Sequence, residues 1–232
     1  MLVVAVPDKS RIEADHLCGQ TVSLPMQGTL DAWQDALRAQ NVPFVDLRQA
    51  LQAAQAPRFF RTDVHMNATG AQAAARQVAE AALPLLKGPG TQAFNEEKPG
   101  PLQPRMGDLI VLAGLEHARP GWRPELDLAA PQKIEPVRGG GLLDETPRVE
   151  VLLAGSSNGR RSNFAERLGM GLGREVWNLS LDGGQFSGAL LLALKQREQW
   201  PKSLKLVIWE FSEMALSLPL TDDEKSVLAR LP

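Results

Sequence analysis

The 232-residue chain has a single cysteine, Cys18. One thiol excludes an internal disulfide and a metal site built from several cysteines, and it does not fix the redox compartment. We expect Cys18 to be a buried, small apolar residue rather than a nucleophile.

An excess of basic residues is also missing, because 25 lysines and arginines face 27 aspartates and glutamates, for a formal net charge of −2. Without a basic face to hold a phosphate backbone, we expect no nucleic-acid partner. Hydrophobic residues make up 44% of the chain and charged residues 22%. This balance is typical of a soluble globular protein.

Long apolar runs are absent as well, since none approaches the roughly 20 residues that span a bilayer. The opening MLVVAVPDKS lacks the basic start and the small-residue cleavage site of a signal peptide. It has the pattern of a buried strand, and a chain that opens on a strand is typical of one trimmed of an upstream segment. The N-terminus therefore predicts no location.

What the chain does contain is an alternation of strands and helices at both of its ends. Short apolar runs predict buried strands at 2–6, 42–47, 149–154, 175–181 and 204–211. Helical spacing predicts helices that start at Thr29, run through Leu51, span 70–86, surround Phe164 and Leu168, and pass through Phe186, Leu190 and Leu194. This order predicts an α/β fold, a three-layer sandwich with a mostly parallel central sheet.

The helix at 70–86 has the clearest pattern. We expect Gly88 and Pro89 to end it. Its predicted buried stripe consists of Ala71, Ala75, Val78, Ala82 and Leu85.

The composition changes at 87–148, which we treat as an insertion into one domain of residues 1–232 because its apolar content is thin. KGPGTQAFNEEKPGPLQP is rich in Gly, Pro and charge and predicts an exposed connection. A strand is expected at 109–113, and irregular structure or short strands at 118–148, where five prolines and the triplet at 139–141 lie.

In parallel sheets, ligands bind beyond the carboxyl ends of the strands, and the stretch LLAGSSNG follows one such strand. Gly155 permits a tight turn, and the helix start behind it offers free backbone N–H groups. Ser156 or Ser157 could therefore be an exposed nucleophile, or either could simply cap the helix.

Asp63-Val64-His65 precedes the helix at 70–86, in a chain that has only three histidines. Residues i and i+2 of an extended loop project to the same side, so Asp63 could hold the imidazole of His65 while its other nitrogen faces a serine. Alternatively, His65 is a surface histidine and Asp63 a turn former. For His16 and His117 we expect surface or packing roles.

A third polar stretch, NLSLDGGQ, follows the strand at 175–181. Asn178 lies at the strand end, and Gly184 belongs to a two-glycine turn whose amide could be a second oxyanion donor, although such turns are common without function. Glu210 ends the last strand and could reach a cleft or pair with a basic neighbour, and we favour a structural role.

Together these segments resemble the alginate O-acetyltransferase family of SGNH-hydrolase-like proteins, envelope proteins that acetylate exopolysaccharides. The resemblance covers most of the chain, and the Asp-x-His motif precedes the serine as in the permuted arrangement of this family. It rests on the joint order of VVAVPDKSRIEADHL, FFRTDVHMNATGA, GDLIVLAGL, VLLAGSSNGRRSNFAERLG and LVIWEFSEMAL.

The resemblance implies that Ser157 is the nucleophile, His65 the base and Asp63 its orienting carboxylate. Ser157 is preferred because the family usually has Gly, then Thr or Asp, then the serine. Where the family has Trp after the histidine, an aromatic after the serine and Arg near the end of the last strand, this chain has Met66, Asn158 and Met214. These departures imply a different sugar-facing surface.

The implied function is polysaccharide O-acetylation through a Ser-His-Asp triad and an acetyl-serine intermediate. A carbohydrate acetylesterase on the same triad and a non-catalytic glycan-binding or scaffold protein are the alternatives. Implied partners are a polysaccharide acceptor, an acetyl donor and a membrane acetyl-transfer protein, in the periplasm or cell envelope. We expect no metal or other cofactor, because neither enzymatic function needs one and the spacing shows no ligand cluster.

Overall fold

The computed structural model describes residues 1–138 and 148–230. Its centre is a five-stranded sheet in the order β2-β1-β9-β7-β8, and every adjacent pair is parallel. The strands are β1 (Leu2–Val6), β2 (Phe44–Asp46), β7 (Val151–Ala154), β8 (Val176–Asn178) and β9 (Leu206–Ser212). All five predicted strands are therefore confirmed, several of them shorter than expected.

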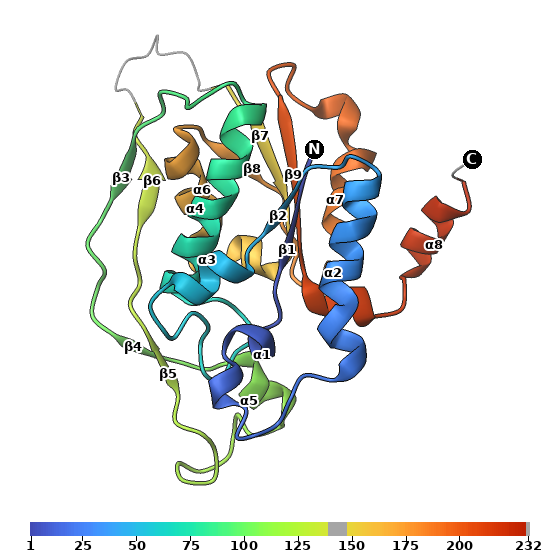
Figure 1. Ribbon diagram of the computed structural model, residues 1–232. Coiled ribbons are helices and arrows are strands. Elements are labelled where there is room, and N and C mark those ends of the chain that lie inside the picture. Colours follow the sequence, from blue (N-terminus) through green and yellow to red (C-terminus); the bar gives the residue numbers. More distant parts are fainter. Residues whose placement is uncertain (139–147, 231–232) are drawn as a thin grey trace.

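Helices cover both faces of this sheet (Figure 1). On one face lie α3 (Arg48–Ala53), α4 (Ala68–Leu85) and α6 (Phe164–Leu172), and on the other lie α2 (Leu24–Ala39) and α7 (Gly188–Lys195). Alternate residues of β1 feed the two cores, because Val4 packs in the first and Val3 in the second. This alternation is why β1 is apolar throughout, and the predicted three-layer sandwich is confirmed.

Short elements connect these layers. They are α1 (Lys9–Ile12) and α8 (Asp222–Leu228), with the 3₁₀ helices η1 (Ala14–His16), η2 (Ser157–Arg160), η3 (Arg197–Gln199) and η4 (Glu213–Ser217). Within the described residues, no helix is both long and apolar enough to cross a membrane.

The insertion has short ordered elements, and the glycine triplet at 139–141 lies outside the described residues. Its strands form two antiparallel pairs, β3 (Phe94–Glu96) with β6 (Ile134–Pro136), and β4 (Gln103–Arg105) with β5 (Asp127–Ala129). The predicted strand at 109–113 is wrong, because these residues belong to α5 (Asp108–Leu112) and its C-cap. Only Ile110 of the run is buried, while Val111 and Leu112 are exposed, so one helical face suffices to bury it.

Four smaller predictions also need correction. The helix predicted from Thr29 begins at Leu24, and the Thr29 hydroxyl donates to the Pro25 carbonyl inside that helix. At the end of α4, the C-cap residue Leu86 rather than Leu85 completes the buried stripe. The helix predicted through Phe186 begins at Gly188. Cys18 is exposed rather than buried, in a turn where its φ is +52°.

Candidate active site

The candidate site lies at the carboxyl ends of the parallel strands. There β7 leads through Gly155 and Ser156 into η2, whose first residue is Ser157. Facing Ser157 lies the segment of residues 60–66, just before α4, which we name the catalytic loop after the role predicted for it. The Asp-x-His pair and the serine therefore come from separate segments that meet at one edge of the sheet.

The three predicted triad residues come together. The Oγ of Ser157 lies 2.7 Å from Nε2 of His65, and Nδ1 of the same ring lies 2.5 Å from Oδ1 of Asp63. Asp63 and His65 are buried, and Ser157 is partly exposed. When Nδ1 donates its proton to Asp63, Nε2 is left as an acceptor for the serine hydroxyl.

Backbone contacts of Met66 connect the catalytic loop with the serine turn (residues 155–159), which lies some ninety residues later in the chain. Its amide donates to Oδ1 of Asn158 over 3.3 Å, and its carbonyl accepts from the Ser162 hydroxyl over 2.7 Å. The Met66 side chain is buried. Met66 and Asn158, two positions at which the chain departs from the family pattern, thus link the histidine to the serine turn.

Glu210 of β9 holds the serine turn through two hydrogen bonds with Ser156. Its Oε2 accepts the Ser156 amide over 2.7 Å and its Oε1 accepts the Ser156 hydroxyl over 2.8 Å. Ser156 also caps η2 by accepting the Asn158 amide. Ser156 is therefore the cap, and Ser157 is the serine that faces His65.

Glu210 is fully buried, and burial raises the pKa of its carboxyl to about 7, although hydrogen bonds from Ser156 and Gly159 oppose this. The structural role that we favoured agrees with these contacts. The partners are backbone and hydroxyl groups, and no basic side chain forms an ion pair with Glu210 within residues 1–138 and 148–230.

The turn leaves no space for side chains at two glycines. A Cβ at Gly155 would lie 2.8 Å from Oε2 of Glu210, and one at Gly159 would lie 2.2 Å from Oγ of Ser180. The Ser180 hydroxyl is buried with no hydrogen-bond partner among the described residues.

Lys9 holds the catalytic loop from the side of β1. Its ammonium donates to the backbone carbonyls of Phe60, Arg61 and Asp63, at 2.8, 2.6 and 3.1 Å. Burial lowers the pKa of this ammonium, although nearby carboxylates oppose the change. The Pro-Asp-Lys turn of the sequence therefore positions the Asp-x-His pair.

The insertion supplies groups that the sequence did not reveal. From β4, Nη2 of Arg105 lies 2.6 Å from Oδ2 of Asp63, and its guanidinium carbon lies 4.5 Å from the ring centre of Phe60. From β5, Asp127 accepts the amides of Arg61 and Thr62 over 2.8 and 2.9 Å. Arg105 lies 39 positions beyond Met66, the end of the loop, and no sequence spacing connects either residue with it.

Asp108, at the start of α5, is a second carboxylate beside the imidazole. Its Oδ1 accepts the Val64 amide over 3.0 Å, and its Oδ2 lies 3.5 Å from Nδ1 of His65. Burial raises the pKa of Asp108, and the neighbouring Asp63 carboxyl adds to this despite the hydrogen bond from Val64. Burial would also raise the pKa of Asp63, but the hydrogen bonds from His65 and the charges of His65 and Arg105 hold it well below its usual range.

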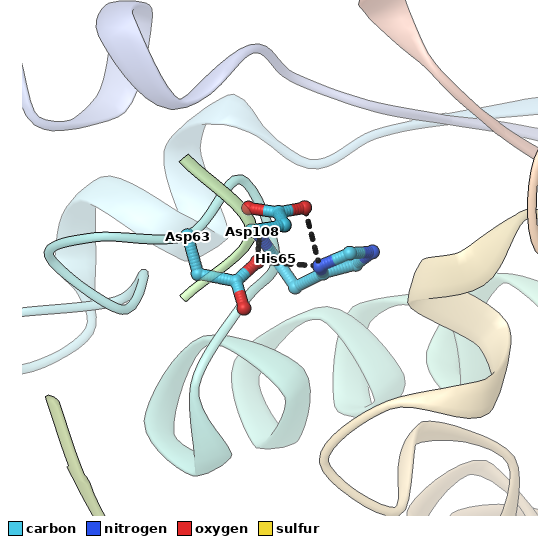
Figure 2. A group of neighbouring side chains, drawn as sticks. All are labelled: Asp63, His65 and Asp108. Carbon is cyan, nitrogen blue, oxygen red and sulfur yellow. Dashed lines mark hydrogen bonds and ion pairs between the residues drawn. The ribbon is translucent and has the colours of Figure 1, made fainter. Parts of the chain in front are cut away.

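Figure 2 shows both carboxylates approaching the same ring nitrogen of His65, whose other nitrogen points away from them. Ligand atoms of Asp63, His65 and Asp108 all lie within 4.8 Å of one another, close enough to hold a metal ion. The expectation that no such cluster forms is therefore wrong. The oxygens of Asp63 already accept hydrogen bonds from His65 and Arg105, so we describe the cluster as a hydrogen-bonded network.

The predicted oxyanion residues differ in placement. Asn178 lies beside the serine turn, because its Nδ2 donates to the Gly159 carbonyl over 2.9 Å. The Gly184 amide donates within its own turn to the Leu181 carbonyl at 3.4 Å, and no hydrogen bond within the described ranges joins it to Ser157. His16 and His117 are exposed, as expected.

Two hollows lie near these segments. One of about 360 Å³ adjoins the serine turn and is lined by Arg160, Asn178, Leu179, Ser180, Leu181 and Leu192. A larger one of about 850 Å³ lies against the catalytic loop and α1, and neither His65 nor Ser157 lines it. Neither residue lines the smaller hollow, which adjoins the serine turn through Arg160 of η2.

A parallel α/β sheet with a serine, a histidine and an aspartate in hydrogen-bonded series at its carboxyl edge is an arrangement that SGNH-hydrolase-like proteins share with other α/β serine hydrolases. Residues 1–213 match the family model of the SGNH hydrolase-like domain of acetyltransferase AlgX. The chain belongs to this family, and the resemblance inferred from the sequence is confirmed.

Individual relatives agree with this assignment. The probable alginate O-acetylase AlgJ of Azotobacter vinelandii is 32% identical over 231 residues, which cover 94% of this chain and 58% of that protein. The alginate biosynthesis protein AlgX of Pseudomonas putida is 28% identical over 159 residues, which cover 67% and 33%. This chain thus spans little more than half the length of the first and a third of the second.

A solved structure, the O-acetyltransferase domain of Pseudomonas putida AlgJ, superposes with a TM-score of 0.77 at 26% identity. The match covers 96% of this chain and 77% of that domain. The SGNH-like fold predicted from the sequence is therefore confirmed.

Proposed function

We propose that this chain is an acyltransferase that transfers an acetyl group to an exopolysaccharide hydroxyl through an acetyl-serine at Ser157. The observation that carries the proposal is the continuous series Asp63–His65–Ser157, with contacts of 2.5 and 2.7 Å. The names of the AlgJ and AlgX relatives support alginate or a related exopolysaccharide as the acceptor.

The first half-reaction forms the acetyl-serine. His65 takes the proton of Ser157 through Nε2 while Oγ attacks the acetyl carbonyl, and the proton then passes to the departing donor group. Asp63 holds the Nδ1 proton and stabilises the imidazolium that forms. In the second half-reaction, His65 takes the proton of a sugar hydroxyl, which attacks the acetyl-serine and releases Ser157 with its proton restored.

The tetrahedral intermediates need hydrogen-bond donors. Ser157 is the first residue of η2, so the helix itself does not use its amide. One such donor contributes roughly 3 kcal/mol to the stability of the transition state. Asn178 keeps a second amide proton beside the same turn and is our candidate for a further donor. The role predicted for Gly184 stays a prediction.

Transfer and hydrolysis share this triad, and the acceptor site separates them. A positioned sugar can reach an effective molarity on the order of 10⁵ M or more and so outcompete water. Positioning of the sugar is thus part of the proposal, as is a membrane acetyl-transfer protein that supplies the acetyl donor. A periplasmic or envelope location is part of the same proposal, and the names of the alginate-modifying relatives support it.

The first test is cleavage of p-nitrophenyl acetate by the wild type, Ser157→Ala and Ser156→Ala. We expect wild-type turnover above the blank, at least about a thousandfold loss in Ser157→Ala, and a smaller loss in Ser156→Ala, which removes a cap. Mass spectrometry should find an acetyl group on the peptide that contains Ser157. Equal rates for the wild type, Ser157→Ala and the blank would favour a non-catalytic glycan-binding or scaffold protein.

A second test adds an alginate oligosaccharide as the acceptor. We expect the wild type to produce acetylated sugar, detected by mass spectrometry, and Ser157→Ala to produce none. Release of acetate without acetylated sugar would instead show a carbohydrate acetylesterase on the same residues.

A further inference from the structure

The small sheet β4–β5 clamps the catalytic loop with two oppositely charged neighbours. Arg105 and Asp127 are cross-strand partners in this antiparallel pair. Asp127 accepts the amides of Arg61 and Thr62, while Arg105 reaches past them to the carboxylate of Asp63. The insertion, which the sequence presents as a segment of thin apolar content, therefore contacts the proposed triad directly.

The surroundings of Arg105 fix its contact with Asp63. The Asp63 side chain is only 2% exposed, so its second oxygen has little access to water, and Arg105 lies 2.6 Å from that oxygen. The ring of Phe60 packs 4.5 Å from the guanidinium and fixes its orientation. Arg105 is thus the cation that compensates the buried carboxylate of Asp63.

The charge of Arg105 matters for His65, because a second carboxylate also lies beside the imidazole. Asp108 lies 3.5 Å from the Nδ1 of His65, so two carboxylates flank one imidazole. Negative charge beside a histidine favours its protonated form, and a protonated imidazole cannot accept the proton of Ser157. The other charged groups that face this network are Lys9, on the backbone carbonyl of Asp63, and Glu210, whose charge acts on His65 from beneath Ser156.

We propose that Arg105 is a positioning residue that offsets the charge of the two carboxylates and so keeps His65 unprotonated and ready to accept the serine proton. The insertion then serves the chemistry through Arg105 rather than through any contact with substrate. This inference rests on the proposed function, because it assigns a role within the same triad.

The test is the pH dependence of kcat/KM with p-nitrophenyl acetate for the wild type, Arg105→Gln and Arg105→Lys. The acid limb reports protonation of the free enzyme's base. Arg105→Gln should move its midpoint upward by about half a pH unit or more. Arg105→Lys keeps the charge and should keep the midpoint near that of the wild type. Its maximal rate should be lower, because lysine lacks the planar guanidinium that contacts Asp63 and packs on the ring of Phe60. Arg119→Gln, an exposed arginine of the same insertion, should leave the profile unchanged.

A second variant, for which we expect a shift of the midpoint in the opposite direction, distinguishes an effect of charge from a purely structural effect. Asp108→Asn removes a negative charge and retains an oxygen for the Val64 amide, so its midpoint should move downward. The double variant Arg105→Gln/Asp108→Asn should return toward the wild type. A structural disturbance would lower the rate in both single variants without opposite shifts.

The outcomes separate the two proposals. If Ser157→Ala is as active as the wild type, the proposed function fails. If Ser157→Ala is inactive while Arg105→Gln keeps the wild-type midpoint, only the role of Arg105 fails. Should Arg105→Gln not fold, an unshifted Asp108→Asn profile would equally overturn that role.

Discussion

At the scale of single residues, Glu210 illustrates how a buried carboxyl can be retained without a cation. Its oxygens accept the amide and the hydroxyl of Ser156, so it organises the turn that ends in Ser157. A neutral Glu210 can keep these bonds, because one oxygen still accepts the amide and the other can donate to the Ser156 hydroxyl. Ionisation of the Glu210 carboxyl therefore destabilises the folded state and not the unfolded chain.

This cost predicts a pH dependence of stability. The pKa of Glu210 is about 7 in the folded protein and about 4.3 in an unfolded chain. Between these values the folded state holds a proton that the unfolded state has released, so stability falls as the pH rises through this window. The total contribution is up to about 4 kcal/mol.

We therefore expect Glu210→Gln, which mimics the protonated carboxyl, to lack this decline. Urea unfolding at pH 5 and pH 8 should show a small stability difference between the wild type and Glu210→Gln at the lower pH, and a larger one in favour of the variant at the higher pH. Glu198→Gln, on an exposed glutamate, is the control and should follow the wild type. A variant that is less stable than the wild type at pH 8 would contradict this account.

At the scale of elements, helix α4 determines where His65 lies. Asn67 is its N-cap, and its Oδ1 accepts the amides of Thr69 and Gly70 over 2.9 and 3.1 Å. Its Nδ2 donates to the Pro57 carbonyl over 2.7 Å, so the same side chain ties the helix to the segment before the catalytic loop. A cap two residues after His65 thus serves both the helix and the candidate site.

We predict that Asn67→Ala costs about 1–2 kcal/mol of stability through the lost cap. Because His65 then loses its fixed backbone, the esterase rate should fall by more than stability alone explains, up to about 100-fold. Asn67→Asp keeps the acceptor and should recover most of the stability. Thermal unfolding and p-nitrophenyl acetate cleavage measure the two effects.

The matched control is another N-cap, Thr221 of α8, which forms a capping box with Glu224. Thr221→Ala should cost a similar amount of stability and leave the rate unchanged. Equal loss of rate in both variants would show that general destabilisation, and not the position of His65, lowers the activity.

The elements also show where sequence patterns succeed. The buried strands were predictable because burial on both faces makes them apolar throughout, as in β1. Helix α4 was predictable because its single buried face repeats with helical spacing. Helix α5 was not, because LIVL has the composition of a strand. The first residues of α5 contact the catalytic loop, because the Leu109 amide donates to the Thr62 carbonyl and Asp108 accepts the Val64 amide, and such tertiary contacts leave no local pattern.

At the scale of the whole molecule, local sequence revealed two of the segments that form the site but not the third. Asp63 and His65 share one loop and Ser157 follows a strand, so each had a local signature. Arg105 and Asp127 act from an insertion with little apolar content. They contact the catalytic loop only because the folded chain brings them next to residues some forty to sixty positions earlier. A single sequence contains no signal for that contact.

This arrangement leads us to predict that the insertion is energetically part of the single domain expected from the sequence. A Cβ at Gly107 would lie 2.0 Å from the Thr62 carbonyl oxygen, so Gly107→Ala must push the insertion away from the catalytic loop. We expect it to lower the free energy of unfolding by about 1–3 kcal/mol and to reduce the esterase rate. Urea unfolding, followed by the fluorescence of tryptophans outside the insertion such as Trp209, should remain one transition at a lower midpoint.

The comparison variant is Gly28→Ala, an exposed position within α2 where a Cβ meets open space. It should leave the rate unchanged and stabilise the protein by about 0.5–1 kcal/mol, because alanine restricts the unfolded chain and favours the helix. A Gly107→Ala protein whose tryptophan transition matches that of the wild type would instead show that the insertion opens independently of the sheet. The contacts of Asp127 and Arg105 would then be too weak to couple it to the core.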